Sequence, residues 1–130
     1  MGIFNSFFGN KEKVESSGNV NWIPFTSLNQ IEEIKKESET NTVVIFKHST
    51  RCGISRMVIK QFEKMFDEAM KDLKVYYLDL LSYRDISNEV GYTFQVLHQS
   101  PQVLVIKNGN AIAHDSHYSI TQLNLKELTS

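Results

Sequence analysis

Residues 42–55 read TVVIFKHSTRCGIS, and this stretch decides the fold. Its first part, TVVIFK at 42–47, is β-branched and apolar without alternation, which predicts a strand buried on both faces at the centre of a sheet. Over residues 54–70 the apolar side chains recur every three or four positions, which predicts a long amphipathic helix. The one cysteine of the chain, Cys52, therefore lies in the turn between a central strand and the start of a helix.

Strand and helix patterns alternate on both sides of this stretch. A predicted strand over 73–80 follows the helix without a hairpin-length turn, so the two strands are expected to pair in parallel. Asn108-Gly109 is a type I′ turn signal, which predicts that residues 111–114 fold back antiparallel onto 102–107. The other predicted elements are an edge strand at 22–25 containing Pro24, a helix capped by Ser27 and running to Glu37, a helix over 85–94, and a last helix capped by Ser119 or Thr121.

The resulting order, β, α, β, α, β, α, β, β, α, predicts an α/β fold in which helices cover both faces of a mixed central sheet. This three-layer sandwich is similar to the thioredoxin fold. Residues 21–130 are predicted to form the thioredoxin-like domain. The polar segment before it, which lacks periodicity, predicts a flexible N-terminal tail over residues 1–20.

The composition excludes several classes of protein. A chain of 130 residues that is 41% hydrophobic has enough apolar material for one core. Its 14 Lys and Arg nearly balance its 15 Asp and Glu, so neither nucleic acid nor an acidic membrane surface is an expected partner. No apolar run reaches the length of a membrane span. A single cysteine excludes an intramolecular disulfide and predicts a cytoplasmic location, where thiols stay reduced.

A lone cysteine is ordinarily a small buried apolar residue. The position of Cys52 predicts a different role, because the unpaired amides at a helix N-terminus stabilise a thiolate, which is the reactive form. The neighbouring Arg51 adds a positive charge that favours the same form. Cys52 is therefore the candidate nucleophile.

Ser55 stands three residues after Cys52, where two-cysteine redox sites carry the thiol that resolves a mixed disulfide. A hydroxyl cannot form a disulfide, but it can donate a hydrogen bond to a thiolate one helical turn away. A mixed disulfide on Cys52 must then be resolved by a thiol from outside the chain. The pattern predicts one-cysteine exchange with a small thiol.

A second feature is Ser100-Pro101-Gln102, which directly precedes the predicted strand VLVIK. Proline at the start of a strand marks a turn or a cis peptide. In thioredoxin-like folds the corresponding proline is cis, faces the active cysteine, and leaves the backbone of the preceding residue free to pair with an extended substrate. Ser100 is the residue expected in that role.

The segments KHSTRCGIS (47–55), HQSPQVLVIKNG (98–109) and HDSHYSIT (114–121) together resemble the monothiol bacilliredoxins of YtxJ type. The resemblance extends over about residues 21–129. It implies that the protein removes bacillithiol from S-bacillithiolated protein cysteines. Family members commonly carry Thr-Cys-Pro-Ile-Ser, so Arg51 and Gly53 depart from the pattern, and Gly53 is expected to loosen the helix start.

The resemblance also implies which residues form the site and what they bind. Active-site support is assigned to Thr50, Arg51, Gly53 and Ser55 around Cys52, and substrate binding to His98, Ser100, Pro101 and Gln102. Bacillithiol is the implied co-substrate, with no permanently bound cofactor and no metal. The expected partners are bacillithiolated proteins, with the chain acting as a monomer or weak dimer.

Two details and two alternative functions stay open at this point. His48 and His98 either touch a bound thiol or cap a strand end, and Lys47, Lys60 and Lys64 either meet the carboxylates of bacillithiol or, as is more usual for lysine, are solvated on the surface. Cys-Gly-Ile-Ser also resembles the Cys-Gly-Phe-Ser of monothiol glutaredoxins, whose cysteine helps to hold a [2Fe–2S] cluster between two protomers. The other alternative is a non-catalytic thioredoxin-like binding module.

Overall fold

Five strands form one sheet in the computed structural model, which describes residues 19–129. They are β1 (Asn21–Pro24), β2 (Val43–His48), β3 (Lys74–Asp79), β4 (Gln102–Lys107) and β5 (Asn110–Ser116). Their order across the sheet is β1-β3-β2-β4-β5, so the strand predicted to be central is central and the predicted edge strand lies at an edge. Strand β2 runs parallel to β3 and antiparallel to β4, which confirms the mixed sheet.

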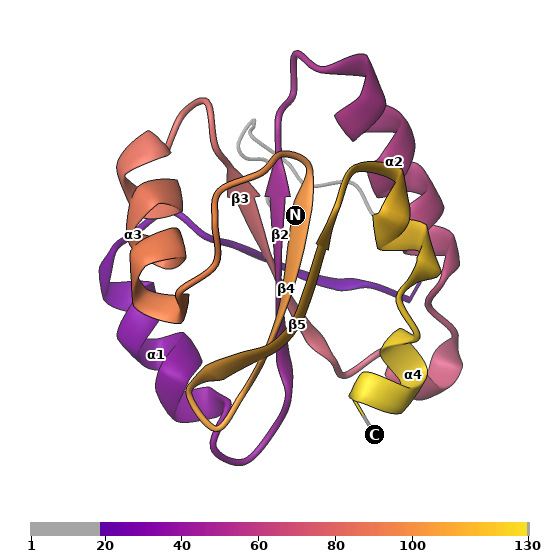
Figure 1. Cartoon of the computed structure of the whole chain (residues 1–130). Coiled ribbons are helices and arrows are strands. Elements are labelled where there is room, and N and C mark those ends of the chain that lie inside the picture. Colours follow the sequence, from indigo (N-terminus) through magenta and orange to yellow (C-terminus); the bar gives the residue numbers. More distant parts are fainter. Residues whose placement is uncertain (1–18, 130) are drawn as a thin grey trace, which may run out of the picture.

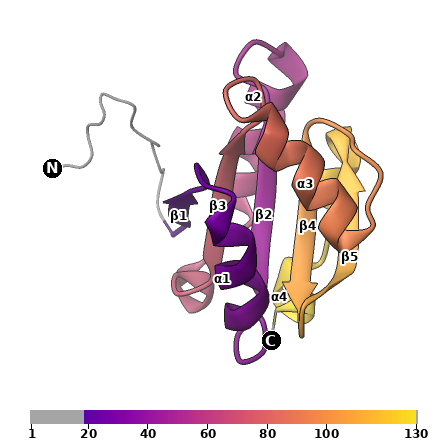
Figure 2. The ribbon, with the colours of Figure 1, turned by 90° about the vertical axis from the view of Figure 1, so that its left-hand side faces the viewer.

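Helices cover both faces of this sheet. They are α1 (Asn29–Glu37), α2 (Gly53–Lys64), α3 (Arg84–Phe94) and α4 (Leu125–Leu128), with two 3₁₀ segments, η1 (Glu68–Met70) and η2 (His117–Gln122). Helices α1 and α3 lie on one face, and α2 and α4 lie on the other, with the sheet seen nearly edge-on between them (Figure 1). Figure 2 looks onto the face that α1 and α3 cover. The predicted three-layer α/β sandwich is therefore confirmed.

The six residues of β2 are all buried, as the unbroken apolar pattern predicts. Val43 and Ile45 belong to the core beneath α1 and α3, whereas Val44 and Phe46 belong to the core beneath α2. Successive side chains of a strand point to opposite faces. The last two residues of β2, Lys47 and His48, consequently reach opposite sides of the sheet.

The turn between β4 and β5 has the predicted conformation. Asn108 has a φ of 53° and Gly109 a φ of 77°, the two positive values that a type I′ turn needs. Ser38, at the end of α1, holds the turn in place: its carbonyl accepts from the Asn108 amide at 2.7 Å and its Oγ from the Gly109 amide at 2.9 Å.

The helix predicted over 54–70 is shorter than expected. Helix α2 ends at Lys64, and the chain forms the separate 3₁₀ turn η1 at 68–70. Asp67 accounts for the break, because its side chain accepts a hydrogen bond from the Ala69 amide at 3.1 Å and so caps a new turn. Phe66 and Met70 remain buried on either side of the break, which is why the apolar pattern continues through it.

Two predicted caps also differ from the structure. The last helix, α4, is capped by Asn124, whose side chain accepts from the Glu127 amide, and not by Ser119 or Thr121, which lie in η2. The N-cap of α1 is Leu28, one residue after the predicted Ser27. Both differences are local shifts at helix ends, where competing polar side chains decide the first turn.

Most of the predicted tail, residues 1–18, lies outside the described residues. At the end of that segment, Asn19 donates to the Phe66 carbonyl at 3.4 Å and Val20 is buried in the core beneath α2. Within the range 19–129, no helix combines the length and the apolar character that crossing a membrane requires.

Candidate active site

The sheet topology brings the two predicted site segments together at one end of the central strands β2 and β4. Strand β2 ends at His48 and leads directly into the Cys52 loop, while β4 begins at Gln102, directly after Pro101. Because these strands are antiparallel neighbours, with Lys47 opposite Gln102, the end of one lies beside the start of the other. Both loops are at the upper end of the molecule in Figure 1.

Cys52 is the N-cap of α2, as its position in the sequence predicts. Its backbone is extended, with φ −102° and ψ 123°, and its carbonyl already accepts the first helical bond, from the Arg56 amide at 3.0 Å. The Cys52 amide donates to the Ser49 carbonyl at 3.2 Å, which closes the loop before the helix. The thiol is free and half-buried, and the N-cap position holds it at the positive end of the helix.

The hydroxyl of Ser55 has a different partner from the predicted one. It is fully buried and lies 2.7 Å from Nδ1 of His48, and it accepts a hydrogen bond from the Ser49 amide at 3.0 Å. Across residues 19–129 these are its hydrogen bonds, so the predicted bond to Cys52 is not formed in this structure. The strand alternation explains the difference, because it points His48 toward α2 and into reach of Ser55.

His48 is buried against aromatic rings, with the ring of Tyr77 5.6 Å away and that of Phe46 6.3 Å away. Burial lowers the pKa of His48 to about 4; the carboxylate of Asp79 opposes this shift and the charge of Arg56 adds to it. The imidazole is therefore neutral at pH 7. With its proton on Nε2, His48 accepts from the Ser55 hydroxyl; with its proton on Nδ1, it leaves that hydroxyl free to donate to a Cys52 thiolate.

The other residues of the Cys52 loop are exposed or half-exposed. Arg51, the predicted cationic neighbour, is exposed. A second cation, Arg56, folds back from the first turn of α2 and donates from Nη1 to the Thr50 carbonyl at 3.3 Å. The one sequence signal for Arg56 is its spacing of four residues from Cys52, which places both on one side of the helix.

Gly53 occupies the first position of α2, and the space around it is open. A Cβ added there would meet only Nη2 of Arg56, at 4.0 Å. The preceding residue, Cys52, already has the extended backbone that proline demands of its neighbour. A proline at this position would therefore fit.

Gly53→Pro is expected to raise the free energy of unfolding by about 0.4–1 kcal/mol, because proline restricts the unfolded chain and suits the first helical position. Urea denaturation of the two proteins would measure the difference. Gly53→Ala is the matched control. Because alanine lacks the proline ring, the difference between the two variants measures how much of the change in the free energy of unfolding comes from the fixed φ angle. A proline variant less stable than the wild type would show that the amide of residue 53 has a structural role.

The peptide bond between Ser100 and Pro101 is cis, as expected for the proline that precedes this strand. The carbonyl of Pro101 accepts from the His117 amide at 2.9 Å, which joins the start of η2 to the same loop. Among residues 19–129 the backbone N–H and C=O of Ser100 have no hydrogen-bond partner. They are therefore available to an extended ligand.

Gln102 and His98 shape the same loop in different ways. Gln102 is buried, and its Nε2 donates to the Leu97 carbonyl at 2.9 Å, so it holds the segment before the cis peptide and does not face solvent. Its Oε1 and the Oγ of Ser100 are buried without a hydrogen-bond partner within the described part of the chain. His98 is exposed at the start of this segment.

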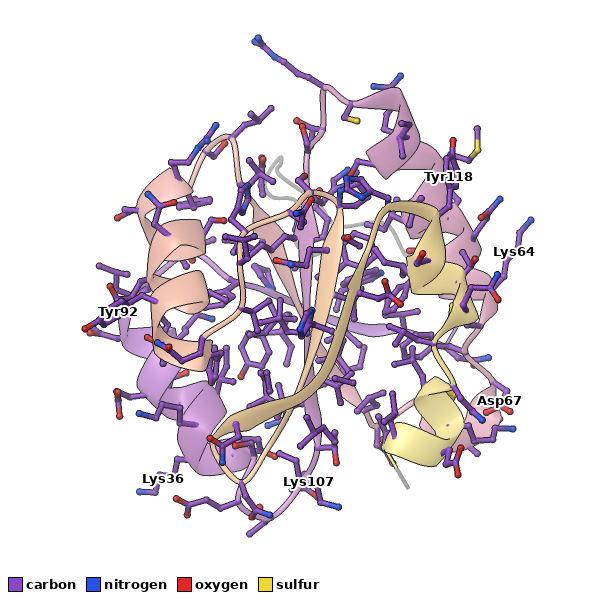
Figure 3. All side chains as sticks on the ribbon, in the orientation of Figure 1. Lys36, Lys64, Asp67, Tyr92, Lys107 and Tyr118 are labelled. Carbon is purple, nitrogen blue, oxygen red and sulfur yellow. The ribbon has the colours of Figure 1, made fainter. Side chains whose placement is uncertain are left out.

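One lysine was interpreted wrongly. Lys60 and Lys64 are exposed, and Lys64 projects outward from α2 (Figure 3), as expected for solvated lysines. Lys47 is instead fully buried. Side chains alternate along β2, so Lys47 lies on the same face of the sheet as Val43 and Ile45, beneath α3. Its Nζ donates to the Ser87 carbonyl at 3.1 Å and lies 3.4 Å from Nδ1 of His98.

Apolar side chains are exposed around the loop of Cys52. Ile54 and Met57, on the first turns of α2, and Leu97, before the cis peptide, are all exposed. Tyr118 of η2 is exposed on the side of the molecule that carries α2 (Figure 3).

In the described part of the chain, no three His, Cys, Asp or Glu residues gather as a metal site would need.

Comparison with known protein families supports the interpretation of these features. The family model described as "Monothiol bacilliredoxin BrxC" matches residues 23–125. This range includes β2, the Cys52 loop, the cis peptide and η2.

Solved structures with a similar fold include a protein described as having a thioredoxin fold, with a TM-score of 0.70 and 29% identity over 83% of this chain and 93% of the other. Thioredoxin from Malassezia sympodialis aligns with a TM-score of 0.65 and 24% identity, over 89% of this chain and 94% of its own. Thioredoxin NaTrxh from Nicotiana alata has a TM-score of 0.65 and 22% identity, covering 88% and 96%. The two thioredoxins establish the fold, which is the thioredoxin fold.

Proposed function

Because the chain belongs to the monothiol bacilliredoxin family, a family of thiol–disulfide redox proteins, we propose that it removes bacillithiol from S-bacillithiolated protein cysteines through a mixed disulfide on Cys52. The observation that supports this most directly is the position of Cys52. It is the N-cap of α2, and it follows the end of β2 that lies beside the cis peptide bond before Pro101. The reducing cytoplasm is the compartment in which such an exchange would operate.

The proposed exchange has two steps. The Cys52 thiolate attacks the bacillithiol sulfur of the mixed disulfide, so that a disulfide forms on Cys52 and the protein cysteine leaves as a thiolate, which takes a proton from solvent. A second, external thiolate then attacks the bacillithiol sulfur held on Cys52. That attack releases the Cys52 thiolate and forms a disulfide between bacillithiol and the external thiol. The external thiol is therefore the reductant: it is oxidised as the protein cysteine is reduced, and the number of disulfides does not change.

The surrounding residues have separate proposed roles. The helix N-terminus, with Arg51 and Arg56 nearby, presents the sulfur of Cys52 for attack on the mixed disulfide. Thr50 and Gly53 shape the loop that presents the sulfur, and the unpaired backbone of Ser100 pairs with the bound substrate. Ser55 keeps the bacillithiol on Cys52 until an external thiol arrives, because a hydroxyl cannot displace it.

Intact mass spectrometry tests this function. After incubation with bacillithiol disulfide, the wild-type chain is expected to gain the mass of one bacillithiol less two hydrogens, and this gain is expected to disappear on adding excess bacillithiol. The same adduct is expected after incubation with a bacillithiolated protein, whose own cysteine should return to the free thiol. Cys52→Ser is the control and should show neither change.

Two results would overturn the proposal. One is wild-type protein that remains unmodified by bacillithiol disulfide at any pH between 6 and 9. The other is removal of bacillithiol from the protein substrate at an equal rate by Cys52→Ser, which would exclude Cys52 as the nucleophile.

A further inference from the structure

Lys47 is a buried charge that has no counter-ion among residues 19–129. It is the only Lys, Arg, Asp or Glu that is fully buried among residues 19–129, and in that range no carboxylate forms an ion pair with it. Its ammonium group contacts the Ser87 carbonyl and Nδ1 of His98. Burying an ammonium costs several kcal/mol unless an opposite charge or several hydrogen bonds compensate it. An anion close to Lys47 would supply that compensation.

The contact with Lys47 decides the tautomer of His98. An ammonium group can only donate hydrogen bonds, so Nδ1 of His98 accepts and the ring proton is on Nε2. Partial desolvation of the ring, followed by the charges of Lys47 and Arg84, lowers the pKa of His98 below its ordinary value and so favours the neutral ring. His98 is therefore a neutral ring with an N–H donor on the side away from Lys47, in a field set by two cations.

His98 is one of the residues that line a pocket. Its volume is about 390 Å³. It is lined by Ser87, Asn88 and Gly91 of α3 and by Gln95, Val96, Leu97 and His98 of the following segment. The two residues that contact the Lys47 ammonium, Ser87 and His98, are both part of the wall, so that ammonium lies immediately behind it.

Gly91, which has no side chain, forms part of this wall. A Cβ at that position would lie 3.0 Å from the Val96 carbonyl, which is tighter than most Cβ contacts, so glycine lets the segment after α3 pass close to the helix without a shift. That close passage leads the chain from the pocket to His98 and then, two residues later, to Ser100.

We propose that this pocket binds a carboxylate group, held by the Nε2–H of His98 and by the charge of Lys47 behind it. Given the proposed function, on which this assignment rests, the carboxylate is that of the malyl group of bacillithiol. In bacillithiol the malyl group and the cysteine are attached to neighbouring carbons of a glucosamine, so the carboxylates and the thiol are at the ends of two separate arms. The thiol would react at Cys52 while the malyl arm reaches the pocket.

The assignment is tested by binding measurements that do not depend on exchange. The probes are S-methyl bacillithiol and S-methyl cysteinyl-glucosamine, the same molecule without its malyl group, titrated calorimetrically into the Cys52→Ala protein. Each of the variants His98→Phe and Lys47→Met removes one interaction with a charged carboxylate. The Kd for S-methyl bacillithiol is therefore expected to be about 10- to 100-fold higher in each variant. The truncated probe should bind all three proteins equally.

Lys64→Met, which removes an exposed lysine from α2, is the matched control and should leave both Kd values unchanged. His98→Phe changes an exposed position, so it tests the pocket even if the Lys47 variant does not fold. Equal affinity for the two probes in the Cys52→Ala protein, or unchanged affinity in His98→Phe, would overturn the carboxylate pocket.

These results separate the pocket from the proposed function. A Cys52 adduct with bacillithiol disulfide, together with equal affinity for the two probes, would refute the pocket alone. The reverse result, selective binding of the malyl probe without an adduct on Cys52, would refute the exchange reaction and leave a carboxylate-binding site.

Discussion

Replacing Ser55 with cysteine is expected to prevent the bacillithiol adduct from accumulating on Cys52. Position 55 is on the first turn of α2, three residues after Cys52, where the two side chains lie on one side of the helix. A thiol there can attack the mixed disulfide from within the chain, expel bacillithiol, and form a disulfide between positions 52 and 55. After incubation with bacillithiol disulfide, intact mass spectrometry should show a chain that has lost two hydrogen atoms in place of the adduct.

The control for Ser55→Cys is a second thiol placed where it cannot reach Cys52. Thr40→Cys serves this purpose because Thr40 is exposed in the turn before β2, at the opposite end of that strand. This variant should keep the adduct on Cys52. An adduct that accumulates equally in Ser55→Cys and the wild type would contradict the argument that the serine is what makes the mechanism depend on an external thiol.

Ser55→Cys is also expected to be less stable than the wild type. The serine hydroxyl is buried and bonds both to His48 and to the Ser49 amide, and sulfur is a weak hydrogen-bond partner. Leaving a buried polar group without a good partner costs about 1–3 kcal/mol. Urea denaturation of the reduced variant would measure this loss apart from the redox change.

Replacing Lys47 with methionine is expected to raise the free energy of unfolding by about 2–3 kcal/mol at pH 7. Burial lowers the pKa of Lys47 from 10.5 to about 8, so the charged lysine is less favourable in the folded protein than in the unfolded chain. At about 1.4 kcal/mol per pKa unit, the penalty at pH 7 is about 3 kcal/mol. Methionine has a similar unbranched shape and no charge, and the loss of the contacts to Ser87 and His98 offsets part of the gain.

The gain should depend on pH in a definite direction. Between the folded pKa of about 8 and the unfolded value of 10.5, the unfolded chain binds more protons than the folded one, so wild-type stability rises with pH in that window. The advantage of Lys47→Met should therefore be largest below pH 8 and shrink toward pH 10.5. Urea denaturation at pH 7 and pH 10 would measure it, with Lys64→Met as the control for a solvated lysine.

A lower stability of Lys47→Met at pH 7 would contradict this prediction. It would show that the ammonium is already well compensated in the free protein, and it would weaken the case for an anion near it. The pairing of results is informative, because the pocket inferred above requires a variant that is more stable and yet binds the malyl probe less tightly.

The sequence by itself determined the features that depend on local signals. A continuous β-branched run marked the central strand, and the spacing of apolar residues marked the helix that follows it, so Cys52 was placed at a helix N-terminus without a structure. The Asn108-Gly109 turn was equally local, because few residues adopt a positive φ easily. The absence of a second cysteine is a covalent fact, and it alone limits the proposed mechanism to an external resolving thiol.

Only the tertiary structure decided what surrounds these features. Lys47 looked like a surface lysine and Ser55 like a partner of Cys52, but strand alternation sends Lys47 beneath α3 and His48 toward Ser55. Whether such residues are buried depends on which helices cover each face of the sheet. The two residues that contact Lys47 are also distant in sequence: Ser87 of α3 is 40 residues away, and His98 of the segment after α3 is 51 residues away, separations that periodicity within one segment cannot detect.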